Sequence, residues 1–136
     1  MKLPKKIMNR SQEIFQDFLK EIDIHLQEIE AGTQVEMYHI KDLAARLYIH
    51  PTHLSNVIKM ETGHAPCYFF EDKLVKIAKE MLATSDLSVA QIAYRLTFDP
   101  SNFNKFFKRF VGVTPAVWRQ QRAAESLTTS AAALPI

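Results

Sequence analysis

The sequence predicts an all-α fold, in which two helix-turn-helix units are joined by a long linker helix and preceded by an extra N-terminal helix. The first observation behind this prediction is an internal repeat. The sequence pattern of residues 40–66 recurs 49 residues later in residues 89–115, with seven identical residues at matching positions. The second observation is that apolar residues in both copies recur at intervals of three and four, the spacing of a helix face. Each copy therefore has the layout of two short helices joined by a tight turn.

Residues 1–34 are predicted to form a basic tip followed by an acidic amphipathic helix. Ser11 is the expected N-cap, and Gly32 stands where the helix would end. An apolar stripe follows this helix at heptad-like spacing and consists of Phe15, Phe18, Ile22, Leu26 and Ile29. The stripe either packs on the first helix-turn-helix unit of the same chain, or forms a homodimer seam or a connection to a sensor domain.

The first helix-turn-helix unit is predicted over residues 35–66 and the second over residues 86–122. Pro51 and Pro100 suit the first position of the second helix in each unit, because the N–H that proline lacks is left unbonded there. Asp99 precedes the later of these two helices and is expected to be its N-cap.

A linker helix is predicted over residues 67–85 and a disordered tail over residues 123–136. The linker has apolar residues at helical spacing, whereas the tail is polar to aliphatic without a period. A helix rises ~1.5 Å per residue, so the linker would span roughly 25 Å. With the body of a unit at each end, the linker would allow two recognition helices to lie about 34 Å apart, which is one turn of DNA.

The outward faces of the two second helices carry residue types that read DNA. Asn pairs with adenine in the major groove, Ser and Thr reach several base edges, and Lys reaches guanine or a phosphate. The predicted base-reading residues are Thr52, His53, Ser55, Asn56, Ser101, Asn102, Asn104 and Lys105. The predicted phosphate contacts are Lys41, Lys59, Lys108 and Arg109.

A polar helix face is more often only a solvated surface, and this is the alternative interpretation for either helix alone. Both copies carry hydrogen-bonding side chains and Lys on the outer face, with Thr or Ser and Lys at the same offsets, and this duplication favours double-stranded DNA as the partner. For single residues the alternative stays open, and His53 either contacts DNA or is a surface residue.

Five segments of the chain resemble the AraC type of bacterial transcription regulators, over about residues 35–122. These segments are residues 42–44, 51–55, 61–66, 86–93 and 107–115. The resemblance implies a seven-helix domain whose two helix-turn-helix units bind adjacent major-groove segments as one chain, and it implies RNA polymerase as a further partner. In the family, base-reading positions fall early in each second helix, which here are Thr52, Ser55, Asn56, Ser101, Asn102, Asn104 and Lys105.

The chain departs from the pattern of that family in three respects. One is that the segment from Leu96 to Phe103 looks one residue shorter than in most relatives, so the second recognition helix is expected to be rotated or to start later. Gly is usual in the two turns because a positive φ is cheap without a Cβ, whereas this chain has Tyr48 and Thr97 there. We therefore expect turns of slightly different geometry. In the linker helix an Arg is common, and Lys73 keeps its charge without the planar set of donors.

The charge is unevenly distributed, although the formal net charge is only +2. Residues 11–36 hold seven acids against Lys20 alone, whereas five cations and no acid lie between Asp99 and Glu125. A basic C-terminal half matches the charge of phosphate and predicts that affinity for DNA falls steeply with salt.

The sequence offers no motif for an enzyme or a cofactor. The five His residues fall on different elements without metal-ligand spacing, and Cys67 has no partner. No signal peptide or membrane-spanning run is apparent, so we expect a cytoplasmic, nucleoid-associated protein. The alternative function is a protein-interaction module that retains the fold but no longer binds DNA, and Tyr48 and Thr97 keep this alternative open.

Overall fold

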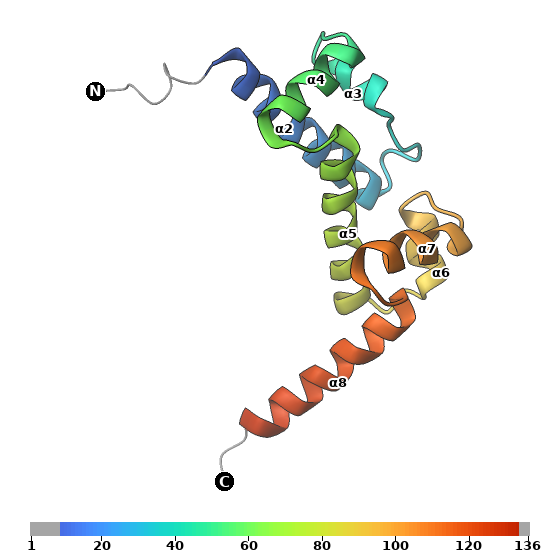
Figure 1. Cartoon of the computed structure of the whole chain (residues 1–136). Coiled ribbons are helices and arrows are strands. Elements are labelled where there is room, and N and C mark those ends of the chain that lie inside the picture. The colour runs from blue at the N-terminus through green and yellow to red at the C-terminus, as the bar shows by residue number, and fades with distance from the viewer. Residues whose placement is uncertain (1–8, 134–136) are drawn as a thin grey trace. The chain divides into compact units, whose positions relative to one another are not determined.

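The computed structural model describes residues 9–133 of the chain, with side chains described for residues 9–125. The described residues form seven α-helices and no strand, which confirms the predicted all-α class and the two helix-turn-helix units. The helices are α2 (Arg10–Ala31), α3 (Ile40–Arg46), α4 (Pro51–Thr62), α5 (Pro66–Thr84), α6 (Val89–Arg95), α7 (Pro100–Val111) and α8 (Pro115–Ala133) (Figure 1).

The chain forms two compact units, Met1–Leu74 and Val75–Ile136, and the division between them falls within α5. The first unit contains α2, α3, α4 and the first half of α5. The second contains the second half of α5 together with α6, α7 and α8. Each unit therefore has one copy of the repeated pair of helices and an apolar core of its own.

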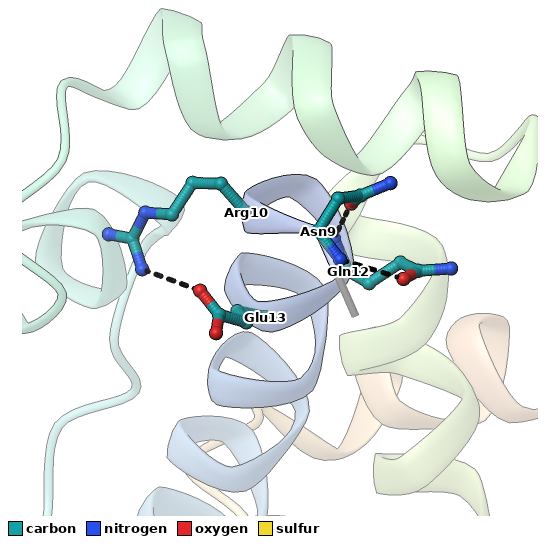
Figure 2. A network of polar contacts seen from close by, with 4 residues as sticks. All are labelled: Asn9, Arg10, Gln12 and Glu13. Atoms are coloured by element: carbon teal, nitrogen blue, oxygen red, sulfur yellow. Dashed lines mark hydrogen bonds and ion pairs between the residues drawn. The ribbon is translucent and has the colours of Figure 1, made fainter. Parts of the chain in front are cut away.

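Helix α2 begins with a reciprocal pair of side-chain hydrogen bonds. The Asn9 side chain accepts a hydrogen bond from the Gln12 N–H at 2.9 Å, and the Gln12 side chain accepts one from the Asn9 N–H at 3.0 Å (Figure 2). Beside this cap, Arg10 and Glu13 form an ion pair at 3.7 Å (Figure 2). The prediction of Ser11 as the cap was wrong, because Asn9 and Gln12 have the spacing that satisfies two backbone N–H groups at once.

The end of α2 and its buried face agree with the sequence. Gly32 ends the helix with φ of 81°, and its N–H donates to carbonyls of the last turn. The buried side chains of α2 are Ile14, Phe18, Ile22, His25, Leu26 and Ile29. They pack on α3 and α4 of the same unit (Figure 1). The same-chain interpretation of the stripe is thus confirmed, and its covered side chains are not exposed for a homodimer seam.

Phe15 differs from the rest of the predicted stripe. Its ring is only partly buried and meets the ring of Phe69 edge-on, with 5.2 Å between the centroids. Ile14 takes the buried position instead, with 3% of its surface exposed. The heptad-like interpretation therefore placed the stripe one residue off at this end.

His25 ties α2 to the segment that leads into α3. Its Nε2 accepts a hydrogen bond from the Tyr38 N–H at 2.9 Å, and the two rings stack with 3.9 Å between centroids and 6° between planes. The imidazole is buried, and its Nδ1 has no hydrogen-bond partner among the described residues. Burial lowers the pKa of His25, because the charged form would lose its hydration there, and this outweighs the opposite effect of nearby Glu28.

The turns of both helix-turn-helix units contain a left-handed residue that is not glycine. Tyr48 has φ of 58° and Thr97 has φ of 69°. Each of these residues donates its N–H to a carbonyl three residues back, Tyr48 to Ala45 and Thr97 to Tyr94. The two turns therefore share one geometry, in the region of φ where glycine carries no strain and an L side chain does.

The core of the second unit is aromatic. Phe103 and Phe107 of α7 are fully buried, and Phe98 from the turn stacks on Phe106 with 5.1 Å between centroids. Trp118 of α8 meets Phe107 edge-on at 6.1 Å. Because aromatic side chains bury large apolar areas, these rings fix the inward face of α7 and leave its opposite face to solvent.

Helix α8 is longer than the sequence predicted. It continues to Ala133, so the prediction of disorder was wrong for residues 123–133. This stretch has no Gly or Pro and is rich in Ala, the residue with the highest helix propensity, and such residues continue a helix that tertiary packing has already started. Residues 134–136, the remainder of the predicted tail, lie outside the described residues.

Candidate nucleic-acid interface

Helix α4 presents one apolar face and one polar face. Pro51 occupies its first position, and the Nδ1 atom of His50 caps it by accepting a hydrogen bond from the Thr52 N–H at 3.1 Å. The buried side chains are Leu54, Val57 and Ile58. On the opposite face, Thr52, His53, Asn56 and Lys59 are exposed and Ser55 is partly exposed. The predicted base-reading residues of the first unit therefore lie together on the accessible face of a single helix.

Helix α7 repeats this arrangement in the second unit. The Asp99 carboxylate accepts hydrogen bonds from the N–H groups of Ser101 at 3.1 Å and Asn102 at 3.4 Å, which confirms the predicted N-cap. The exposed side chains of the helix include Ser101, Asn102, Asn104, Lys105, Lys108 and Arg109. Every site residue predicted in the second unit is thus accessible, and hydrogen-bonding groups precede the cations along the helix.

Lys41 differs from the other predicted phosphate contacts because it lies on α3 rather than on α4 or α7. It is exposed in the first turn of that helix. The first helix of a helix-turn-helix unit crosses the DNA backbone while the second enters the groove, so this position suits contact with phosphate rather than with a base.

The cap at His50 is the local feature that sequence reasoning missed. His50 stands 49 residues before Asp99, in the register of the repeat, and both side chains accept a hydrogen bond from the N–H two residues on. The register of the repeat is the sequence signal that could have identified this cap. Histidine is an uncommon capping residue, so composition alone did not indicate it.

Among the cations that bond to other parts of the fold are Arg46, Lys73 and Arg119. The Arg46 Nε atom lies 2.6 Å from a Glu21 carboxylate oxygen. The Lys73 Nζ lies 2.8 Å from Asp23. In the second unit, Arg119 donates from Nε to the carbonyl of Leu82 at 2.9 Å, close to the C-terminal end of α5. Lys73 therefore joins α5 to α2.

Other kinds of site find little support among the described residues. Within residues 9–133, no group of three or more His, Cys, Asp and Glu residues is placed to hold a metal ion. Cys67 is exposed. Nor does any helix described in the structure have the length and apolar character needed to cross a membrane.

Comparison with known families agrees with this geometry. The model of a family described as "Helix-turn-helix domain" matches residues 43–121, which includes both repeated units. The chain belongs to the AraC-type helix-turn-helix family. A relative in this family, the uncharacterized transcriptional regulator YtdP of Bacillus subtilis, is 34% identical over 84 residues, which cover 61% of this chain and 11% of YtdP. The chain spans about a third or less of the length of the curated relatives that it matches.

Solved structures of the family share the fold. The C-terminal domain of AraT, a response regulator from Geobacillus stearothermophilus, superposes with a TM-score of 0.71 at 26% identity, covering 84% of this chain and 89% of that domain. The DNA-binding domain of the transcriptional factor AdpA, solved in complex with a target DNA, gives a TM-score of 0.64 at 29% identity, covering 79% of this chain and 94% of that domain.

Proposed function

We propose that this chain is a sequence-specific double-stranded-DNA-binding transcription regulator, or the DNA-binding part of one, which inserts α4 and α7 into adjacent major-groove segments. One observation carries the proposal. Two capped helices each expose short hydrogen-bonding side chains near their start and cations farther along. A similar domain, that of AdpA, was solved on its target DNA, which supports the same partner for this chain.

Within this proposal the exposed residues have two kinds of role. Residues in the first two turns of each helix read base edges, namely Thr52, His53, Ser55, Asn56, Ser101, Asn102, Asn104 and Lys105. Cations at the flanks contact phosphate, namely Lys41, Lys59, Lys108 and Arg109. Hydrogen bonds to bases then supply the sequence preference, and phosphate contacts set position and affinity.

Further partners follow from the family rather than from the geometry of this chain. Relatives are named as transcriptional regulators and activators, which supports action at promoters and contact with RNA polymerase. AraT is a response regulator, which supports a sensor domain connected through α2 in the working protein. A protein that acts on promoters works on the nucleoid, so a cytoplasmic, nucleoid-associated location belongs to this proposal.

A mobility-shift titration combined with selection from a random duplex pool tests the proposal. We expect shifts at low salt that weaken steeply as salt rises, and a selected motif with two half-sites about one helical turn apart. Duplexes that fail to shift at any salt concentration would contradict DNA binding and favour the protein-interaction module.

Substitutions separate the two kinds of role. Asn56→Ala removes a neutral hydrogen-bonding group, so it should alter the selected sequence while leaving the salt dependence unchanged. Lys108→Ala should weaken binding to all sequences and lower the salt slope by about one unit. Selection and titration of both variants check this. If the two variants behave alike in both assays, the assignment of roles is wrong.

A further inference from the structure

The internal repeat allows a matched comparison between α4 and α7. Each outward position of α4 has a counterpart 49 residues later on α7, and the two helices have the same length of 12 residues. The matched pairs that include a cation are Asn56 and Lys105, Lys59 and Lys108, and Met60 and Arg109. All six side chains are exposed. One matched pair therefore carries a cation in both copies, and two pairs carry a cation on α7 alone.

The charges of the whole units differ in the same direction. Residues 1–74 hold nine Lys and Arg against eleven Asp and Glu, whereas residues 75–136 hold eight against four. The first unit is thus slightly acidic and the second is basic. A polyanion such as DNA attracts the second unit more strongly at long range.

Cations of the first unit are also held by acids of α2. Arg46 pairs with Glu21 and Lys73 pairs with Asp23, and each pair joins α2 to another helix of the unit. These pairs partly neutralise two cations of the first unit, and in the second unit Arg122 pairs with Glu125 in the same way. The asymmetry therefore rests on the number of cations rather than on their pairing. On α4 itself, Lys59 is the single Lys or Arg.

We propose that α7 is the electrostatic anchor of the interface and that α4 reads DNA mainly through neutral hydrogen-bonding groups. The inference rests on the proposed function and adds an order of engagement to it. Each phosphate that a cation neutralises releases counterions and contributes about 0.9 to the slope of log K against log salt. Helix α7 therefore holds the chain on DNA of any sequence, and α4 docks stably only where its hydrogen bonds match the bases.

Reciprocal exchanges within the repeat test this asymmetry, because every substitution uses a residue that the other copy already carries. The double variant Lys105→Asn and Arg109→Met removes two cations that would lie beside DNA, Lys105 at a base edge and Arg109 at a phosphate. It should lower the salt slope by about one to two units and weaken binding to random duplexes. The reverse double variant, Asn56→Lys and Met60→Arg, should raise the slope by up to about two units and reduce the preference for the selected motif. Titrations at several salt concentrations measure both effects.

Controls keep the result interpretable. Lys20→Asn removes an exposed cation from the acidic face of α2 and should leave the slope unchanged. Since all the exchanged side chains are exposed, circular dichroism melting curves of the variants should match those of the parent chain. The proposal that α7 is the electrostatic anchor is overturned if the parent chain binds selectively and the α7 double variant keeps the full salt slope. The anchor also fails if Lys59→Ala lowers the slope as much as that double variant. A parent chain that binds no duplex overturns the proposed function itself.

Discussion

Tyr48 and Thr97 hold the left-handed position in the turns of the two units, with φ of 58° and 69°. An L side chain at such a φ costs about 1 kcal/mol or more, and Thr is the harder case because its β-carbon is branched. Nothing in the hydrogen bonding of the turns requires either side chain, since the bonds are formed by the backbone. Strain is therefore retained at both turns that orient the second helices.

Replacing either residue by glycine should stabilise the chain. We expect Tyr48→Gly and Thr97→Gly each to raise the free energy of unfolding by about 0.5–1 kcal/mol, because relief of strain exceeds the entropy that Gly adds to the unfolded chain. Urea denaturation measures the change. Alanine at the same positions keeps the positive φ with a Cβ and should give no gain; a gain as large as that of glycine would refute the strain argument.

His25 should make stability depend on pH. Its pKa in the folded chain lies below the ordinary value of about 6.5, so the unfolded chain binds the proton more readily. The contribution of the neutral imidazole is fully present above pH 6.5 and is lost as pH falls from there toward the lowered pKa. Glu28 and Asp42 favour the proton and Arg46 disfavours it, but burial has the largest effect.

The variant His25→Leu tests whether His25 causes this dependence of stability on pH. It removes the titrating group while filling part of the buried space, so its free energy of unfolding should fall less steeply than that of the parent chain between pH 6.5 and pH 5. Denaturant titrations across this range give the comparison. His53→Gln serves as the control, because His53 is exposed and its side chain forms no hydrogen bond or ion pair with another described residue. Parallel pH profiles for the parent chain and His25→Leu would show that His25 does not titrate in this way.

At the scale of elements, the caps decide where the second helices begin. Asp99 satisfies two N–H groups at the start of α7, so Asp99→Ala should lower the free energy of unfolding by about 1 kcal/mol. Thermal and urea denaturation measure the loss. Asp99→Asn keeps an acceptor at the same place and should cost much less. Equal losses for Ala and Asn would mean that the carboxylate acts by charge rather than as a cap.

Most elements could be predicted because their signals are local. Pro51 and Pro100 start helices, Gly32 ends one, and the repeat aligns the two units without any knowledge of their packing. Ser11 was mistaken for a cap because several polar residues compete near that end, and only geometry shows that Asn9 and Gln12 pair. The extension of α8 was missed because an Ala-rich stretch has no periodic apolar face, although its propensity is high.

The candidate site could be predicted to the level of which side chains are exposed. The amphipathic spacing of α4 and α7 places their polar residues outward, and the structure agrees. Contacts between distant residues could not be predicted, since neither the Arg46–Glu21 pair nor the bond from Tyr38 to His25 leaves a pattern in the sequence. Which base each side chain reads stays a prediction, because it depends on DNA that the chain alone does not contain.

At the scale of the whole molecule, the two units have separate cores. Phe18 is fully buried in the first unit, and Phe18→Ala should lower the stability of that unit by about 3–5 kcal/mol. The aromatic core around Phe103 and Phe107 does not include this side chain, so α6 and α7 should keep their protection. Hydrogen exchange followed by mass spectrometry measures both units in one experiment.

Ile24→Ala provides the control on the same helix, because 44% of the Ile24 surface is exposed. It should leave exchange in both units close to that of the parent chain. If Phe18→Ala accelerated exchange in α6 and α7 as much as in α3 and α4, the units would unfold as one, and α5 would transmit the damage.

The exposed Cys67 has a practical consequence for every assay of assembly state. It is the only cysteine of the chain, and its thiol is accessible in the first turn of α5. Air oxidation can link two copies through this sulfur, and the resulting covalent pair migrates like an assembled species. Sedimentation and gel experiments therefore need a reductant or Cys67→Ser before a dimer is attributed to biology. The same thiol accepts a single maleimide dye, which provides a fluorescent reporter without any further substitution.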